Sequence, residues 1–130
     1  MTEMNLTPIG RIHTPYKTLA DCPSAPHAGQ EARIELHPAF APGLKGLNAS
    51  EVDVLYWFDR AARDVLQSVR PHDGVHCGVF AMRSPHRPNP IALSRVTVLS
   101  VDETGLTVSG MDCLDGTVLV DLKPVPRVAT

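Results

Sequence analysis

The sequence predicts a mainly β, single-domain protein whose short strands form a barrel or a sandwich. Several short segments are rich in β-branched and other apolar residues, and turn signals separate them throughout. Only one stretch of the chain shows a helical spacing of apolar residues. With 130 residues the chain is long enough to bury one core but too short for two domains.

The N-terminal third predicts two strands separated by a loop. Residues 6–13 form the first expected strand, which Thr14 and Pro15 end. Residues 17–30 contain prolines and a glycine without apolar periodicity, so an irregular loop is expected. Apolar and polar residues alternate over 33–37, which is the pattern of a half-buried strand.

The middle of the chain predicts a third strand over residues 51–58. One of its faces would carry Val52, Val54, Tyr56 and Phe58, and Leu55 and Trp57 on the other face indicate burial on both sides near its end. Residues 59–69 follow, and their apolar spacing fits either a short helix or a loop excursion.

The second half predicts further strands and a proline-rich connection. Residues 78–81 are expected to end a buried strand. Strands are also expected over 91–101, 106–111 and 117–122, with a hairpin connection over 102–105 that ends in glycine.

The connection over residues 82–90 holds an unusual density of hydrogen-bonding side chains. Its three prolines disfavour a helix and leave a stiff, extended loop. Two guanidinium groups offer planar, bidentate donors for a carboxylate or a phosphate. The loop therefore fits a preformed site for an anionic or polar ligand, and equally a proline-stiffened surface turn. Its polar side chains are Arg83, Ser84, His86, Arg87 and Asn89.

Composition limits the classes of function. A net charge of −2 gives no global basic field that would indicate a nucleic-acid partner, although a local basic patch can still bind RNA. Three widely spaced cysteines favour reduced packing residues over disulfides or a thiolate metal site. His72 and His76 flank a turn sequence, so loop histidines are expected there and no metal. Without a secretory signal or an apolar run that could span a membrane, the expected location is cytoplasmic.

Four motifs, in order, resemble the TsaA-like family, also called the YaeB family. They lie at residues 9–17, at 43–47 with 54–58, at 78–94, and at 112–117 with 121–124. The characterised members of that family are S-adenosylmethionine-dependent tRNA methyltransferases. The resemblance implies one TsaA-like domain over residues 1–130, folded as an open β-barrel and assembled as a homodimer. It also implies S-adenosylmethionine as cofactor, which composition and periodicity do not indicate.

The matching motifs imply a set of cofactor-binding residues. The chain departs from the family at His27 and Ala28, where the family has Arg and Gln after a proline, and at Asp59, where it commonly has His. Met82 and Ala92 replace a Thr and a Gly of the family. The positions carried over are Pro26, His27, Ala28, Asp59, Arg60, Arg83, Ser84, His86, Leu93, Met111, Asp112, Leu114, Asp115 and Thr117.

The resemblance further implies that the methyl acceptor is threonylcarbamoyladenosine, next to the anticodon of tRNA. Arg87, Lys123 and Arg127 are the hypothesised phosphate contacts, and recognition is expected without the C-terminal extension of longer members. The proton acceptor stays open among His86, Asp121 and Tyr16. Two alternatives to tRNA methylation are an S-adenosylmethionine-binding sensor module and a small-molecule methyltransferase.

Overall fold

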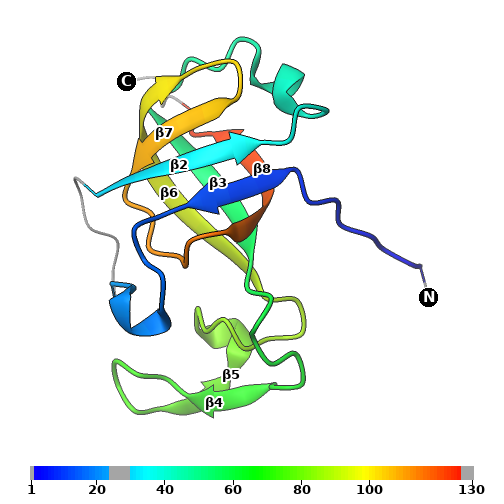
Figure 1. Ribbon diagram of the computed structural model, residues 1–130. Helices are drawn as coiled ribbons and strands as arrows, with labels where there is room; N and C mark the ends of the chain where they lie inside the picture. Colours follow the sequence, from blue (N-terminus) through cyan, green and yellow to red (C-terminus); the bar gives the residue numbers. More distant parts are fainter. Residues whose placement is uncertain (1, 24–29, 127–130) are drawn as a thin grey trace.

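The computed structural model describes residues 2–23 and 30–126, which form a β-barrel with a small hairpin appended at one end (Figure 1). Six strands close the barrel in the order β1-β2-β7-β6-β3-β8, and β4 pairs with β5 outside it. All the pairings are antiparallel. The strands are β1 (Gly10–His13), β2 (Glu31–Leu36), β3 (Glu51–Trp57), β4 (Gln67–Val69), β5 (His76–Gly78), β6 (Ile91–Val101), β7 (Gly105–Ser109) and β8 (Thr117–Pro124).

The mainly β fold and the barrel are confirmed, but the expectation of an open barrel is wrong. Strand β1 pairs with β8 as well as with β2, with Gly10 opposite Leu119 and Ile12 opposite Thr117. This pairing satisfies the backbone groups that a free sheet edge would expose.

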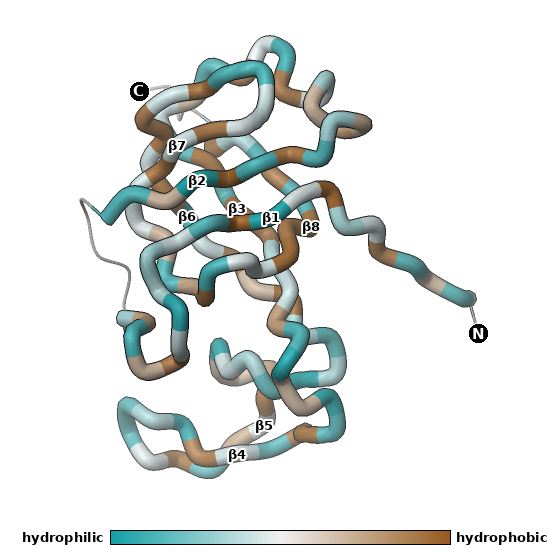
Figure 2. The backbone as a smooth tube through the Cα atoms, viewed as in Figure 1, coloured by the Kyte–Doolittle hydropathy of each residue, from teal (hydrophilic) through white to brown (hydrophobic). Residues whose placement is uncertain are grey.

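Alternating side chains build the core inside the barrel. Val52, Val54 and Tyr56 of β3 are buried, whereas their neighbours along the strand are exposed or only partly buried. Figure 2 shows the same alternation of hydrophobic and hydrophilic residues along β2. The buried cluster comprises Ile12, Ala32, Ile34, Leu36, Leu44, Val52, Val54, Tyr56, Val96, Leu106, Val108, Met111, Cys113 and Leu119.

Two glycines allow the strands on either side of β2 to approach its backbone closely. A Cβ atom built on Gly10 would collide with the carbonyl oxygen of Glu35, and one built on Gly105 would collide with that of Ile34. Both glycines sit in ladders beside β2, so only a residue without a side chain fits at either position.

Three expected elements differ in the structure. The first strand covers only Gly10–His13, where 6–13 was expected, and Pro8 just before it has no N–H to donate. The helix considered over 59–69 is absent, because this part of the described chain forms turns followed by β4. Leu66 and Val69 stay exposed, so a helical apolar stripe would have no surface to cover. Residues 78–81 do not end a buried strand: β5 stops at Gly78 and a short 3-10 turn follows.

The short helical turns are all of the 3-10 type: η1 (Leu19–Asp21), η2 (Ala41–Leu44) and η3 (Val79–Ala81). Within residues 2–23 and 30–126, none of the helices has the length and hydrophobicity that crossing a membrane requires. The hairpin connection expected over 102–105 is present, with a carboxylate oxygen of Asp102 accepting the backbone N–H groups of Thr104 and Gly105.

Candidate functional site

Three connecting segments of the chain meet at the end of the barrel that carries the β4–β5 hairpin (Figure 1). Strand β3 ends here at Trp57, opposite Ile91, where β6 begins. Strand β8 begins at Thr117, opposite Ile12 of β1. The register of these pairs brings the proline-rich loop 82–90, the turn 14–22 and the segment 110–116 to this end of the barrel.

Two adjoining cavities open among these segments. The first, of about 210 Å³, we call the apolar cavity. The second, of about 490 Å³, we call the arginine cavity. Phe58 and Asp112 line both of them. The apolar cavity is lined by Leu19, Cys22, Trp57, Phe58, Asp59, Arg60, Ala61, Pro85, His86, Asp112, Cys113, Leu114 and Thr117. The arginine cavity is lined by Tyr56, Phe58, Phe80, Met82, Arg83, Ser84, Arg87, Ile91, Ala92, Leu93, Ser94 and Asp112.

The Asp112 carboxylate accepts a hydrogen bond from one buried hydroxyl, which a second hydroxyl from another strand contacts in turn. The Tyr56 hydroxyl donates to its Oδ1 atom at 3.1 Å and lies 2.8 Å from the Ser94 hydroxyl. Burial raises the pKa of the Tyr56 phenol well above its usual value, so the hydroxyl keeps its proton. The Phe58 ring packs edge-on against Tyr56, with ring centroids 5.5 Å apart.

Arginine side chains fix the shape of the proline-rich loop. Arg87 donates from Nη1 to the carbonyl oxygens of Met82 and Ser84, at 3.1 and 3.2 Å. Arg83 donates from Nη2 to the Leu93 carbonyl at 3.1 Å. Each guanidinium has five N–H groups, so both keep donors for a ligand beyond these bonds.

A third arginine, which the sequence did not single out, braces the loop from outside. Arg63 donates from Nε to the Pro88 carbonyl at 2.7 Å and from Nη2 to the Asn89 side chain at 3.2 Å. Its guanidinium also stacks over the Trp57 ring, 5.2 Å from the centroid. The loop is therefore a braced wall of the site.

The His86 ring has a defined hydrogen-bonding role. Its Nδ1 atom accepts the backbone N–H of Ala62 at 3.0 Å, so in the neutral ring the proton lies on Nε2. Nε2 is then a donor beside the apolar cavity and not a proton acceptor. Burial raises the pKa of the Cys113 thiol to about 12, so this second cavity residue stays protonated and is no nucleophile near neutral pH.

The structure brings many of the predicted cofactor residues together and leaves others apart. Asp59, Arg60, Arg83, Ser84, His86, Leu93, Asp112, Leu114 and Thr117 line one or both cavities. Met111 lies in the core with 1% exposure, and Asp115 uses its carboxylate to bind Lys17 and the Thr14 N–H. Pro26, His27, Ala28 and Arg127 lie outside the described residues.

The hypothesised phosphate contacts do not form one patch. Arg87 lines the arginine cavity, whereas Lys123 lies opposite Asp53, near the other end of β3. Lys123 and Asp121 face each other at 3.8 Å. Of the three proton acceptors considered, Asp121 and Tyr16 line neither cavity. Within the described chain, no group of histidine, cysteine and carboxylate side chains is arranged to hold a metal ion.

Sequence reasoning missed Tyr56 and Ser94 as site residues. The sequence predicts that Tyr56 shares one face of its strand with Val52 and Val54, and the available signal was a single hydroxyl in an otherwise apolar row. Ser94 ends the proline-rich motif, but only the pairing of β3 with β6 brings it beside Tyr56.

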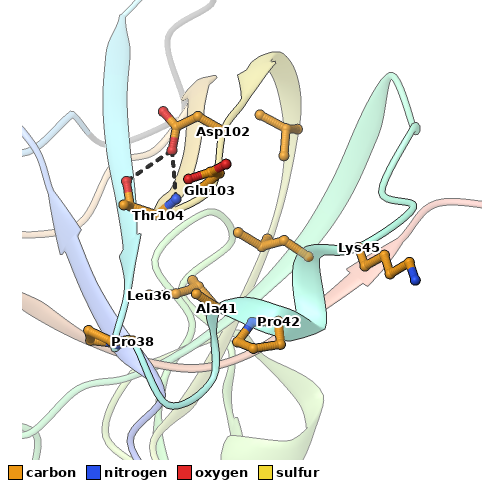
Figure 3. A pocket seen from close by; sticks show the side chains of 10 residues that line it. Leu36, Pro38, Ala41, Pro42, Lys45, Asp102, Glu103 and Thr104 are labelled. Carbon is orange, nitrogen blue, oxygen red and sulfur yellow. Dashed lines mark hydrogen bonds between the residues drawn. The ribbon is translucent and has the colours of Figure 1, made fainter.

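A larger cavity, of about 770 Å³, lies at the opposite end of the barrel between η2 and the β6–β7 turn (Figure 3). Leu36, Ala41 and Pro42 form much of its wall. The Asp102 carboxylate on its rim is already bound to Arg33 at 2.7 Å and to Thr104. Convergent polar groups with free donors instead mark the hairpin end as the candidate site.

Comparison with known proteins identifies the family. Residues 11–129 match the family model of the tRNA-methyltransferase O N-terminal domain. The chain belongs to this family. The family expected from the four motifs is thereby confirmed.

Relatives and solved structures agree with this family. A probable S-adenosyl-L-methionine-binding protein of Archaeoglobus fulgidus is 46% identical over 95% of this chain and 34% of its own length. The tRNA (adenine(37)-N6)-methyltransferase of Escherichia coli is 34% identical over 95% of this chain and 58% of its own length. The crystal structure of TrmO from Pseudomonas aeruginosa superposes with a TM-score of 0.82 at 31% identity, over 97% of this chain and 57% of that one. The chain thus spans about a third to three fifths of the length of these family members.

Proposed function

We propose that this domain binds S-adenosylmethionine across the two cavities and transfers its methyl group to threonylcarbamoyladenosine beside the anticodon of tRNA. The observation that carries the proposal is the pair of adjoining cavities, one apolar and one arginine-lined, that share the Asp112 carboxylate. The E. coli family member that is a tRNA (adenine(37)-N6)-methyltransferase supports the reaction class.

The chemistry of the two cavities fits the parts of this cofactor. An adenine ring needs an apolar slot with a few polar edges, and Trp57, Phe58 and Leu114 line the apolar cavity. The amino-acid carboxylate needs cationic donors, and Arg83 and Arg87 line the other cavity. Asp112 lines both cavities, so its carboxylate would face the central sulfonium of a cofactor that spanned them.

When bound, S-adenosylmethionine supplies an electrophilic methyl group on a sulfonium. The residues of the chain then contribute alignment and the exclusion of water. The Arg63, Arg83 and Arg87 bonds hold the loop that walls the site, which lowers the entropy lost on binding. The Nε2–H of His86 is placed to donate a hydrogen bond, so proton removal falls to another group or to water.

We also propose that Arg87, Lys123 and Arg127 bind phosphate groups of the tRNA. Arg87 lies in the loop near the C-terminal end of β3, and Lys123 of β8 lies opposite Asp53, near the N-terminal end of β3. One RNA strand would therefore have to run along the barrel wall to contact both. Separate phosphate contacts of this kind need only local positive charge, so they are compatible with a net charge of −2.

Binding without methyl transfer is the second candidate function. The A. fulgidus relative is named for binding S-adenosyl-L-methionine, and this chain departs from the family at His27, Ala28 and Asp59. These departures favour a sensor module or a methyltransferase that acts on a small molecule. We further propose that residues 1–130 form one domain and that the protein is a homodimer in the cytoplasm. Light scattering of the purified chain should then give twice the mass of the monomer.

One pair of measurements tests the function. Calorimetric titration with S-adenosylmethionine gives the affinity, and labelled methyl transfer to tRNA that carries threonylcarbamoyladenosine gives the activity. Binding with transfer is expected. Binding without transfer to tRNA would favour the second candidate function, and turnover on small acceptors would then separate a methyltransferase from a sensor. Absence of binding would overturn both.

A further inference from the structure

A chain of two hydroxyl groups runs from β6 to Asp112 through the inside of the barrel. Tyr56 is 3% exposed, and its hydroxyl joins Ser94 at 2.8 Å and the Asp112 Oδ1 atom at 3.1 Å. These three residues lie on β3, on β6 and in the segment before β8, so the chain spans three parts of the fold.

The direction of the hydrogen bonds follows from the proton count. A carboxylate only accepts, and a phenol has one proton to donate. Tyr56 therefore donates to Asp112, and the Ser94 hydroxyl donates to the Tyr56 oxygen. Among the described residues, Tyr56 is the only hydrogen-bond donor to Asp112. The orientation of this carboxylate thus depends on one buried hydroxyl.

Stability alone does not explain a polar chain at this point. The other inward side chains of β3, Val52 and Val54, are aliphatic, and a Phe would fill the space of Tyr56 without a hydroxyl to satisfy. The chain ends at a carboxylate in the wall that the two cavities share. Its position fits a function that needs negative charge at that wall.

We propose that Tyr56 and Ser94 are positioning residues, which hold the Asp112 carboxylate so that the site prefers a sulfonium cofactor over its neutral thioether product. This inference rests on the proposed function. Methyl transfer breaks the bond from sulfur to the methyl carbon and forms a bond from that carbon to the acceptor nitrogen. The electron pair of the broken bond stays on sulfur, which becomes neutral, and the acceptor nitrogen gives its proton to water or to a base. A carboxylate fixed beside the sulfur therefore attracts the sulfonium of S-adenosylmethionine, a charge that the thioether of S-adenosylhomocysteine lacks.

The test is calorimetric titration of the full chain with each of these two ligands. For the unchanged protein we expect S-adenosylmethionine to bind at least about tenfold more tightly, which is about 1.4 kcal/mol. Tyr56→Phe should lower the affinity for S-adenosylmethionine about tenfold and change the affinity for S-adenosylhomocysteine by less than about twofold. Ser94→Ala should lower the affinity for S-adenosylmethionine by a smaller factor. Ser94→Thr, which keeps the hydroxyl, should retain the preference for S-adenosylmethionine.

Tyr16→Phe is the matched control, because it removes another buried tyrosine hydroxyl. That hydroxyl makes no hydrogen bond within the described part of the chain, and Tyr16 lines neither cavity. Its two affinities should equal those of the unchanged protein. If Tyr56→Phe fails to fold, Asp112→Asn carries the same test, because it removes the charge and nearly keeps the shape.

The outcomes separate this inference from the proposed function. Equal losses for both ligands in Tyr56→Phe would show a merely structural role and overturn the inference while cofactor binding stands. An unchanged preference in both Tyr56→Phe and Asp112→Asn would also overturn it. A lost preference supports it, even in a protein that transfers no methyl group to tRNA. Binding of neither ligand to the unchanged protein would overturn the inference and the proposed function together.

Discussion

The Nζ atom of Lys17 lies 2.6 Å from Oδ2 of Asp115, and the two residues are 98 positions apart in the chain. The other carboxylate oxygen of Asp115 accepts the backbone N–H of Thr14 at 3.0 Å. One side chain thus joins the turn after β1 to the segment before β8, next to the apolar cavity.

This contact predicts an acid-sensitive contribution to stability. The Lys17 hydrogen bond lowers the pKa of Asp115 in the folded protein. The carboxylate therefore stabilises the fold above the unfolded pKa of about 4, and this contribution is lost as the pH falls through the lowered folded value. Asp115→Ala should lower the free energy of unfolding at neutral pH by about 1 kcal/mol. Urea unfolding at neutral pH and at about pH 2.5 measures the difference, which should shrink in acid.

Asp64→Ala is the control for this experiment, since Asp64 is exposed and makes no hydrogen bond to another described residue. It should change the stability by less than about 0.5 kcal/mol. A deficit of Asp115→Ala that is equally large in acid would show that packing, and not the ionised pair, is responsible.

The glycines beside β2 predict a large steric effect. Gly105→Ala should destabilise the protein by about 3 kcal/mol, because the new Cβ would collide with the Ile34 carbonyl in the middle of the barrel wall. Gly43→Ala should be nearly neutral, since no atom lies within 4 Å of the position of its Cβ. Thermal unfolding of both variants checks the contrast, and equal melting temperatures would mean that the strands can separate without cost.

Removal of the Arg83 side chain should weaken cofactor binding. Its guanidinium lines the arginine cavity and keeps donors beyond its bond to the Leu93 carbonyl. Arg83→Ala should weaken S-adenosylmethionine at least about tenfold in calorimetry, since a charge-assisted pair is lost. Arg95→Ala is the control: Arg95 lies on β6, the strand that Arg83 contacts, but it is paired with Asp53 outside the cavities, so its loss should leave the affinity unchanged. An affinity of Arg83→Ala equal to that of the unchanged protein would give this residue another role.

The proposed RNA path predicts two separable effects on tRNA binding. Charge reversal by Lys123→Glu should lower the affinity for tRNA. It should also reduce the slope of log affinity against log salt concentration by about 0.7 to 0.9. It should leave S-adenosylmethionine affinity unchanged, because Lys123 lies opposite Asp53, away from both cavities. Arg87→Glu should reduce the slope by a similar amount.

Because Arg87 also braces the loop, titration of its variant with S-adenosylmethionine serves as the control for loop damage. Salt slopes that neither variant alters would remove both residues from the proposed RNA path.

Local sequence patterns predicted most strands because the cause of each is local. Alternation predicted β2 and β3 close to their observed positions, and β-branched residues predicted β6. The turn residues 102–105 predicted the β6–β7 hairpin. For the segment 59–69 the local pattern was not enough, because it does not show whether a surface is available for packing. Its apolar spacing allows a helix, but without a surface to cover, the chain forms turns and the short strand β4.

The sequence predicted those site residues that belong to a family motif. Among them are Arg83, His86 and Asp112, which line the two cavities. The roles of Tyr56 and Ser94 could not be read in this way. They are 38 positions apart, and Tyr56 and Asp112 are 56 apart, so their contacts depend on strand pairing.

The sequence by itself determined the strand-rich pattern, the stiff loop 82–90 and the family, because prolines, alternation and motifs act within short stretches of chain. Only the tertiary structure decided that the barrel closes, that Asp112 lies between two cavities, and that Lys123 is remote from Arg87. The physical reason is register. A shift of one residue in the pairing of β3 with β6 or β8 would turn every side chain to the other face of the barrel wall.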